Sequence, residues 1–104
     1  MEKIEEFAEI FQALSDPTRL RLVKLLGDCM PGVCKGGPLC VNALSHRLGV
    51  TQSAVSQHLR ILKHARLVRG ERHGSFMHYS LDPGGVEKCK AGLNEAFGEK
   101  LKIE

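Results

Sequence analysis

The 104-residue sequence predicts one mainly α-helical domain that carries a single β-hairpin. Apolar residues recur at spacings of three and four in five separate stretches, which is typical of helices with one buried face. After Ala65 the period changes to two over a pair of short runs, and this alternation indicates two paired strands. A chain of this length is expected to form one domain, residues 1–104, whose small core would benefit from a partner subunit.

Two helices are predicted before residue 28. Apolar residues between Ile4 and Leu14 form one stripe, and glutamates occupy the first turns, where the helix dipole favours negative charge. Asp16 and Pro17 are typical of the N-cap and first position of a second helix, which we expect to run to Gly27. Because this second helix is apolar on more than one side, it is expected to be the central buried helix.

Residues 41–65 predict a second helix pair joined by a tight turn. Val41–Leu48 carries one apolar stripe, Gly49 supplies the stop, and Thr51 is the N-cap candidate of the next helix. In that helix Ala54, Val55, Leu59 and Leu62 are expected to face inward, whereas the outer face is polar: Gln52, Ser53, Ser56, Gln57 and Arg60. This is the plan of a DNA-binding helix-turn-helix.

A basic hairpin is predicted directly after this helix, with strands at residues 67–69 and 76–81. Such a hairpin is a "wing", able to lay Arg69, Arg72 and His73 along the phosphate backbone or in the minor groove. Residues 41–82 hold six Lys or Arg against two acidic residues, whereas the flanking segments sum to −1 and zero. This concentration indicates a phosphate-binding face, the alternative being an ordinary solvated surface.

A last amphipathic helix is predicted from Val86 to Leu101, after a break at residues 82–85. The first and last helices each carry an aromatic stripe that little else in so small a fold can cover. We therefore expect a homodimer through these two helices. Its interface residues are predicted to be Phe7, Phe11, Leu93 and Phe97. The expected fold class is a winged helix-turn-helix with five helices.

Other classes of protein are disfavoured by the sequence. No apolar run approaches the ~20 residues that cross a bilayer, and the acidic start MEKIEEF does not read as a secretory signal. We therefore expect a cytoplasmic protein without a membrane partner. No Ser/His/Asp set, phosphate loop or pair of carboxylates indicates an enzyme.

The sequence resembles the ArsR/SmtB family of winged helix-turn-helix repressors over nearly its whole length. The resemblance is carried by ALSDPTRLRLVKLL (Ala13–Leu26), by residues 39–81 with their wing pattern R-x-G-x-x-x-x-Y-x-L, and by the closing helix. It implies a homodimer that binds palindromic operators in double-stranded DNA and is released by an effector, often a metal ion. The sequence departs from the family pattern at Arg66, where a glycine is common.

Carried over by this resemblance, the residues expected at the DNA groove are Thr51, Gln52, Ser53, Ser56, Gln57 and His58. Glutamine can pair with adenine through two hydrogen bonds, and Ser or Thr can contact several bases. Contact with phosphate alone is the alternative for each Ser and Thr. His58 is also open to another interpretation, as an inward-facing residue with its polar atoms satisfied.

Three cysteines, Cys29, Cys34 and Cys40, surround the loop at residues 27–38, which holds four glycines and two prolines. A flexible loop with three thiols suits a soft ion such as As(III), Sb(III), Cd(II) or Pb(II). Small apolar packing residues, or a thiol redox or persulfide sensor, are the alternatives. Of the family's known sites, the Cys-Val-Cys pattern retains only its first cysteine here. The zinc site of the last helix falls on Pro83, Gly85, Ala96 and Glu99 and is not expected. Cys89 lies on the apolar stripe of the last helix.

Overall fold

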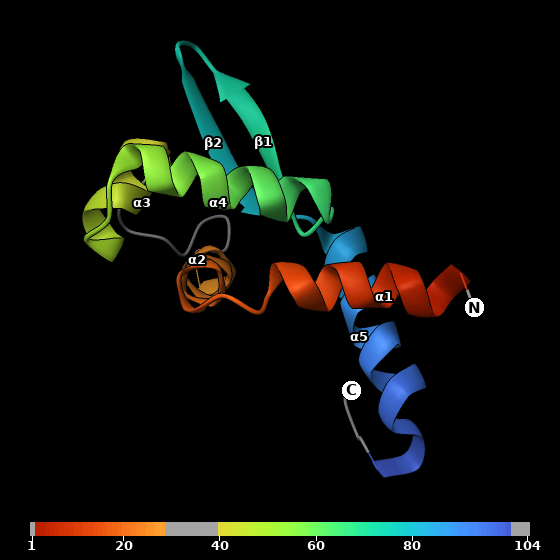
Figure 1. The fold of residues 1–104 in the computed structure, drawn as a ribbon. Coiled ribbons are helices and arrows are strands. Elements are labelled where there is room, and N and C mark those ends of the chain that lie inside the picture. The colour runs from red at the N-terminus through yellow and green to blue at the C-terminus, as the bar shows by residue number, and fades with distance from the viewer. Residues whose placement is uncertain (1, 29–39, 101–104) are drawn as a thin grey trace.

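The computed structural model describes residues 2–28 and 40–100 of the chain, as helices around one antiparallel hairpin (Figure 1). The elements in chain order are α1 (Glu2–Ala13), α2 (Pro17–Asp28), α3 (Val41–Leu48), α4 (Gln52–His64), β1 (Val68–His73), β2 (Phe76–Leu81), α5 (Pro83–Phe97) and the short 3-10 helix η1 (Gly98–Lys100). The predicted fold class, five helices with a hairpin wing, is confirmed.

The start of α2 is fixed by the residues that the sequence indicated. The Asp16 carboxylate accepts hydrogen bonds from the backbone amides of Thr18 and Arg19, at 2.9 and 3.1 Å. Pro17 follows as the first helical residue, where its missing N–H costs nothing. Helix α2 contributes Leu22 and Leu26 to the core, whereas Leu20 is 51% exposed, so the expected central burial holds for one face of the helix.

The core lies where α2, α3, α4 and the base of the hairpin meet. Its five most deeply buried side chains come from three of these helices: Leu22, Leu44, Val55, Leu59 and Leu62. The buried residues of α4 repeat at spacings of three and four, so one face of that helix is consumed by the core and the opposite face is left to solvent.

The hairpin pairs Val68 with Leu81 at its base and His73 with Phe76 at its tip. Only Gly74 and Ser75 remain as the turn, so β1 runs four residues beyond its predicted end. Gly74 has φ +64°, and glycine at the first position of a two-residue loop is typical of the type II′ turn.

Helix α5 begins at Pro83, three residues before the predicted start. The Asp82 carboxylate accepts from the Gly84 amide at 3.0 Å and caps the helix. Gly85 then lies against the backbone of Arg66, so closely that a Cβ at Gly85 would come within 1.8 Å of the Arg66 carbonyl oxygen. Gly85 therefore marks a tightly packed first turn of α5 rather than a break in the chain. Helix α5 ends at Phe97, and Leu101 lies outside the described residues.

Arg66 itself has φ +61°. This is the left-handed region that glycine occupies without steric cost, whereas other residues are strained there. The backbone of this chain thus explains why a glycine is common at this position in the resembling family.

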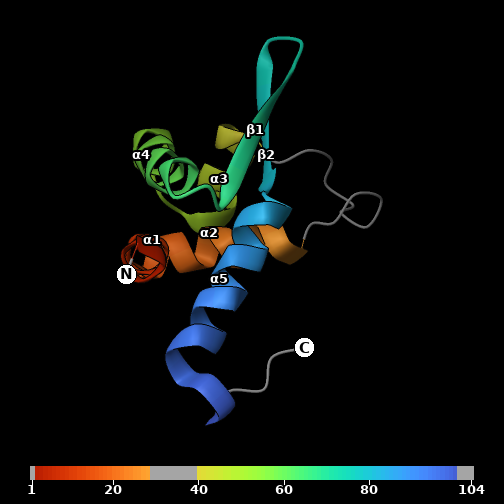
Figure 2. The ribbon, with the colours of Figure 1, turned by 90° about the vertical axis from the view of Figure 1, so that its right-hand side faces the viewer.

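Helix α1 packs across α5, and the second half of α5 extends away from the rest of the molecule (Figures 1 and 2). Phe7 of α1 lies on Gly92 of α5, where an added Cβ would come within 2.8 Å of the Phe7 ring. Lys88 and Glu6 form an ion pair between the same two helices. Within residues 2–28 and 40–100, no helix has both the length and the apolar character to span a membrane.

Candidate nucleic-acid interface

Helices α3 and α4 form a helix-turn-helix whose turn is fixed by local hydrogen bonds. Gly49 has φ +67°, and its amide donates to the Ser45 carbonyl oxygen at 2.9 Å. The Ser45 hydroxyl donates to the carbonyl oxygen of Val50. Thr51 caps α4, with its hydroxyl accepting from the Ala54 amide at 3.1 Å. These bonds tie the end of α3 to the start of α4 through local contacts.

The outer face of α4, termed here the reading row, consists of exposed polar side chains: Thr51, Gln52, Ser53, Ser56, Gln57 and Arg60. Side chains in this row can donate and accept hydrogen bonds, as base edges and phosphates require. One member is oriented by the preceding helix, because the Gln52 Nε2 donates to Asn42 Oδ1 at 3.0 Å. Sequence reasoning missed Asn42, since no spacing rule relates residues across the turn.

His58 does not belong to the reading row. Its ring faces the junction of α1 and α2, with Nδ1 3.3 Å from Arg19 Nη1 and 3.9 Å from Asp16 Oδ2. Only 22% of its side chain is exposed. We therefore withdraw His58 from the predicted groove contacts, and the inward-facing alternative describes its position.

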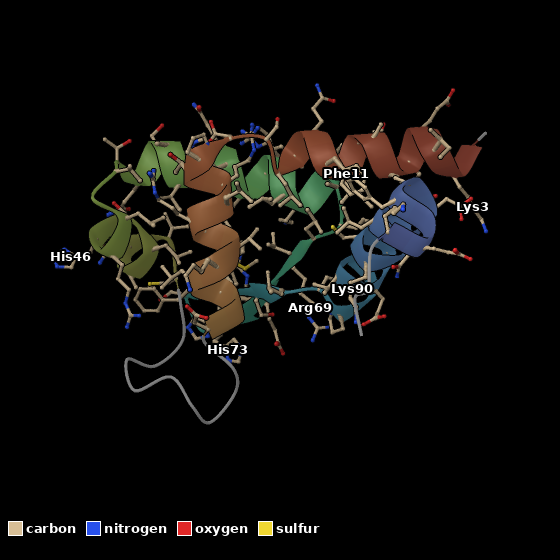
Figure 3. The ribbon with its side chains drawn as sticks, turned by 90° about the horizontal axis from the view of Figure 1, so that it is seen from below. Lys3, Phe11, His46, Arg69, His73 and Lys90 are labelled. Carbon is tan, nitrogen blue, oxygen red and sulfur yellow. The ribbon has the colours of Figure 1, made fainter. Side chains whose placement is uncertain are left out.

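The wing places its charged residues on an exposed strand pair. Arg69, Arg72 and His73 are all exposed, and Arg69 and His73 lie on the side of the hairpin away from α4 (Figure 3). The His73 and His78 rings stack with centroids 4.3 Å apart, and the Glu71 Oε2 atom lies 3.8 Å from His73 Nε2.

The wing and α4 share one side of the molecule. In Figures 1 and 2 the hairpin extends beyond α4 in one direction, while α1, α2 and α5 lie in the other. A duplex lying across α4 could therefore meet both the reading row and the wing. This geometry can bind a groove and the adjacent backbone at once.

The aromatic residues predicted at a dimer interface are divided between the inside and the outside of the chain. Phe7 is only 8% exposed because it packs on α5 of its own chain, so it is withdrawn from the predicted interface. Phe11, which points from α1 toward α5 in Figure 3, and Leu93 are half-buried. Phe97 is 57% exposed. Ile4, which was not among the predicted interface residues, is 51% exposed. An apolar surface therefore remains on α1 and α5.

Of the cysteines, the structure describes only Cys40 and Cys89, and neither is in a disulfide. Cys40 is the N-cap residue of α3, where its half-buried side chain makes no capping hydrogen bond. Burial raises the pKa of the Cys89 thiol, which fits a packing residue. Cys29 and Cys34 lie outside the described residues. Within the described ranges, no three Cys, His, Asp or Glu side chains are grouped to hold a metal ion.

The fold and this interface define the chain as a winged helix-turn-helix DNA-binding domain, and similarity to known proteins gives the family. Residues 16–69 match the family described as "Bacterial regulatory protein, arsR family". The chain therefore belongs to the ArsR family, as the sequence resemblance indicated. It is a transcriptional regulator and not an enzyme.

Individual relatives agree with this assignment. An uncharacterized HTH-type transcriptional regulator of Methanocaldococcus jannaschii is 40% identical over 76% of this chain and 81% of the relative. A "Transcriptional repressor SmtB homolog" of Synechocystis sp. is 41% identical over 78% of this chain and 55% of its own length. A crystal structure described as a "Possible transcriptional regulator for arsenical resistance" superposes with a TM-score of 0.71. It is 34% identical, and the match covers 89% of this chain and 88% of that one.

Proposed function

We propose that the protein is a homodimeric repressor that binds an inverted-repeat operator in double-stranded DNA. The observation that carries the proposal is that the exposed reading row belongs to α4, a helix that lies on the same side of the molecule as the basic wing. The row would enter the major groove, and Arg69, Arg72 and His73 would contact the neighbouring backbone or minor groove. Phe11, Leu93 and Phe97 would join two chains, and α4 of each would read half-sites about one helical turn (~34 Å) apart. A repressor of chromosomal genes would act in the cytoplasm.

DNA binding is tested by enriching bound duplexes from a random-sequence pool and measuring affinity by fluorescence anisotropy. We expect an inverted repeat, dimer stoichiometry, and affinity that falls steeply with salt. Gln57→Ala should cost about 1–3 kcal/mol of discrimination at one base position. Gln12→Ala is the matched control, because Gln12 is an exposed glutamine on α1, away from the wing side. A monomer, or binding without sequence preference, contradicts the proposal.

We further propose that a thiophilic effector, arsenite or antimonite or a soft metal ion, releases the DNA by binding Cys29, Cys34 and Cys40. Two observations support this: the Cys40 thiol at the start of α3 is left free by the helix cap, and a related structure carries the description of arsenical resistance. Three thiolates suit a soft or thiophilic centre. Ligation would pull on the first residue of the helix-turn-helix, and release requires that the effector bind the DNA-free state more tightly.

The effector site is tested by titrating arsenite into the reduced protein–DNA complex. Cys29→Ser, Cys34→Ser and Cys40→Ser should each abolish release, whereas Cys89→Ser, the control, should respond like the parent. If all four variants respond like the parent, the three-thiol site is wrong. Mass spectrometry separates metal from redox sensing, because a bound ion adds its own mass whereas peroxide or polysulfide makes a sulfur bridge.

A further inference from the structure

Arg19, at the start of α2, contacts three helices at once. Its Nε donates to the carbonyl oxygen of Ala13, the last residue of α1, at 2.6 Å. Its own backbone amide donates to Asp16, the N-cap of α2. Its Nη1 lies 3.3 Å from Nδ1 of His58, in the middle of α4. One side chain therefore joins the end of the proposed dimer helix to the helix that carries the reading row.

The chemistry of Arg19 and His58 determines which of the two donates the hydrogen bond. A guanidinium stays protonated and can only donate, so Nδ1 of His58 must accept. Asp16, whose Oδ2 is 3.9 Å from the same ring nitrogen, keeps the guanidinium's surroundings negative. At the other end, the Ala13 carbonyl belongs to a helix C-terminus, which favours a cation.

The Arg19–His58 hydrogen bond restrains the orientation of α4 in a way that the apolar core does not. Val55, Leu59 and Leu62 hold α4 by apolar contact, which is not directional. A hydrogen bond to His58 is directional, and it acts on the side of α4 that faces α1 and α2. The link therefore resists rotation and sliding of α4 relative to α1. Arg19 is half-buried and belongs to a helix on the side of α4 away from the wing, so it does not itself face the duplex.

We propose that Arg19 is a positioning residue for operator recognition: through His58 it fixes α4 relative to α1, and so sets the distance between the two reading rows of a dimer. This rests on the proposed function, in which α1 joins the two chains. The consequence is that Arg19 determines how strictly the protein measures the spacing of its two half-sites.

The test compares Arg19→Gln with Arg21→Gln in the full chain. Arg21 is an exposed arginine of the same helix, so its loss removes the same charge. Affinity is measured on the inverted repeat enriched by the parent, and on the same repeat with one base pair added or removed at its centre. His58→Gln and the double variant complete the set, with circular dichroism to confirm folding.

We expect Arg19→Gln to bind the native repeat about tenfold more weakly than Arg21→Gln and to lose most of the parent's preference for the native spacing. Its salt slope should equal that of Arg21→Gln, because a lost phosphate contact would lower the slope by about 0.9. The double variant should bind no more weakly than Arg19→Gln alone, because both changes break one link.

An unchanged spacing preference, a salt slope lower by about one, or multiplicative effects in the double variant would each overturn the inference. His58→Gln keeps the Arg19–Ala13 bond and serves as the decisive variant if Arg19→Gln does not fold. If the parent itself selects no inverted repeat, the proposed function fails. If the parent does and Arg19→Gln matches Arg21→Gln, only this inference fails.

Discussion

Replacing Gly85 by alanine should destabilise the domain severely, whereas the same change at its neighbour Gly84 should not. A Cβ at Gly85 would lie 1.8 Å from the Arg66 carbonyl oxygen and 2.7 Å from its carbon, both backbone atoms. An ordinary contact begins at 3.4 Å, so α5 would have to retreat by about 1.6 Å. At Gly84 the nearest atom is Asp82 Oδ1 at 3.4 Å, which needs no movement.

Two opposing free-energy terms decide whether alanine stabilises or destabilises the domain at Gly84 and at Gly85. Alanine gains roughly 0.5–1 kcal/mol over glycine within a helix. Overpacking typically costs about 1–3 kcal/mol, and more where a side chain cannot yield. Because the obstacle at Gly85 is backbone, we expect Gly85→Ala to lose at least ~3 kcal/mol of unfolding free energy. Gly84→Ala should lie within about 1 kcal/mol of the parent.

Urea denaturation followed by circular dichroism measures both variants. The proposed dimerisation would make apparent stability depend on concentration, so the proteins are compared at one protomer concentration. A Gly85→Ala variant within 1 kcal/mol of Gly84→Ala would refute the close approach of α5 to Arg66. It would also refute the account of the early start of α5.

Three further predictions concern Arg72 of the wing, Arg66 just before the wing, and the Asp16 cap of α2. Arg72→Ala should weaken operator binding and lower the salt slope by about 0.9, as measured by anisotropy at several salt concentrations; an unchanged slope argues against a phosphate contact. Arg66→Gly should change unfolding free energy by 0 to about +1.5 kcal/mol, because relief of left-handed strain (~1–2 kcal/mol) is offset by added flexibility of the unfolded chain (~0.5–1 kcal/mol); clear destabilisation in urea would contradict the strain. The Arg19 amide, with His58 and Thr18 also contributing, holds the pKa of Asp16 below its usual value despite some desolvation. Its carboxylate therefore stabilises the fold above about pH 3.9, and this contribution is lost as pH falls through the lowered value. Asp16→Asn should accordingly flatten the acid limb of stability in a pH series, and an acid limb as steep as the parent's would count against the cap.

The parts of this molecule that were predictable are those governed by local rules. Gly49 predicts the turn after α3, and Thr51 predicts the N-cap of α4, because the chemistry of each residue acts within a few positions of the chain. The wrong or missing predictions concern contacts between distant segments. His58 lies three residues after Val55 and four before Leu62, so its spacing left an inward position open, but no local pattern identifies Arg19, 39 residues away, as its partner. Phe7 is buried because Gly92 offers a flat surface on α5, which no periodicity reveals.

The same distinction explains the start of α5. Two consecutive glycines after a proline are typical of a turn, and only the approach of Arg66 shows why a helix needs glycine there. The three-thiol site stays a prediction, since two of its cysteines lie outside the described residues.

The Asn42–Gln52 hydrogen bond has a consequence for selectivity. It uses one N–H of the Gln52 amide and leaves the other N–H and the oxygen available. Those two atoms are the pair with which glutamine recognises adenine. A base opposite Gln52 would meet an amide that is already oriented, so less side-chain freedom is lost on docking. Asn42 follows Cys40, the N-cap of α3, by two residues, so a displacement of the start of α3 would also move the group that orients Gln52.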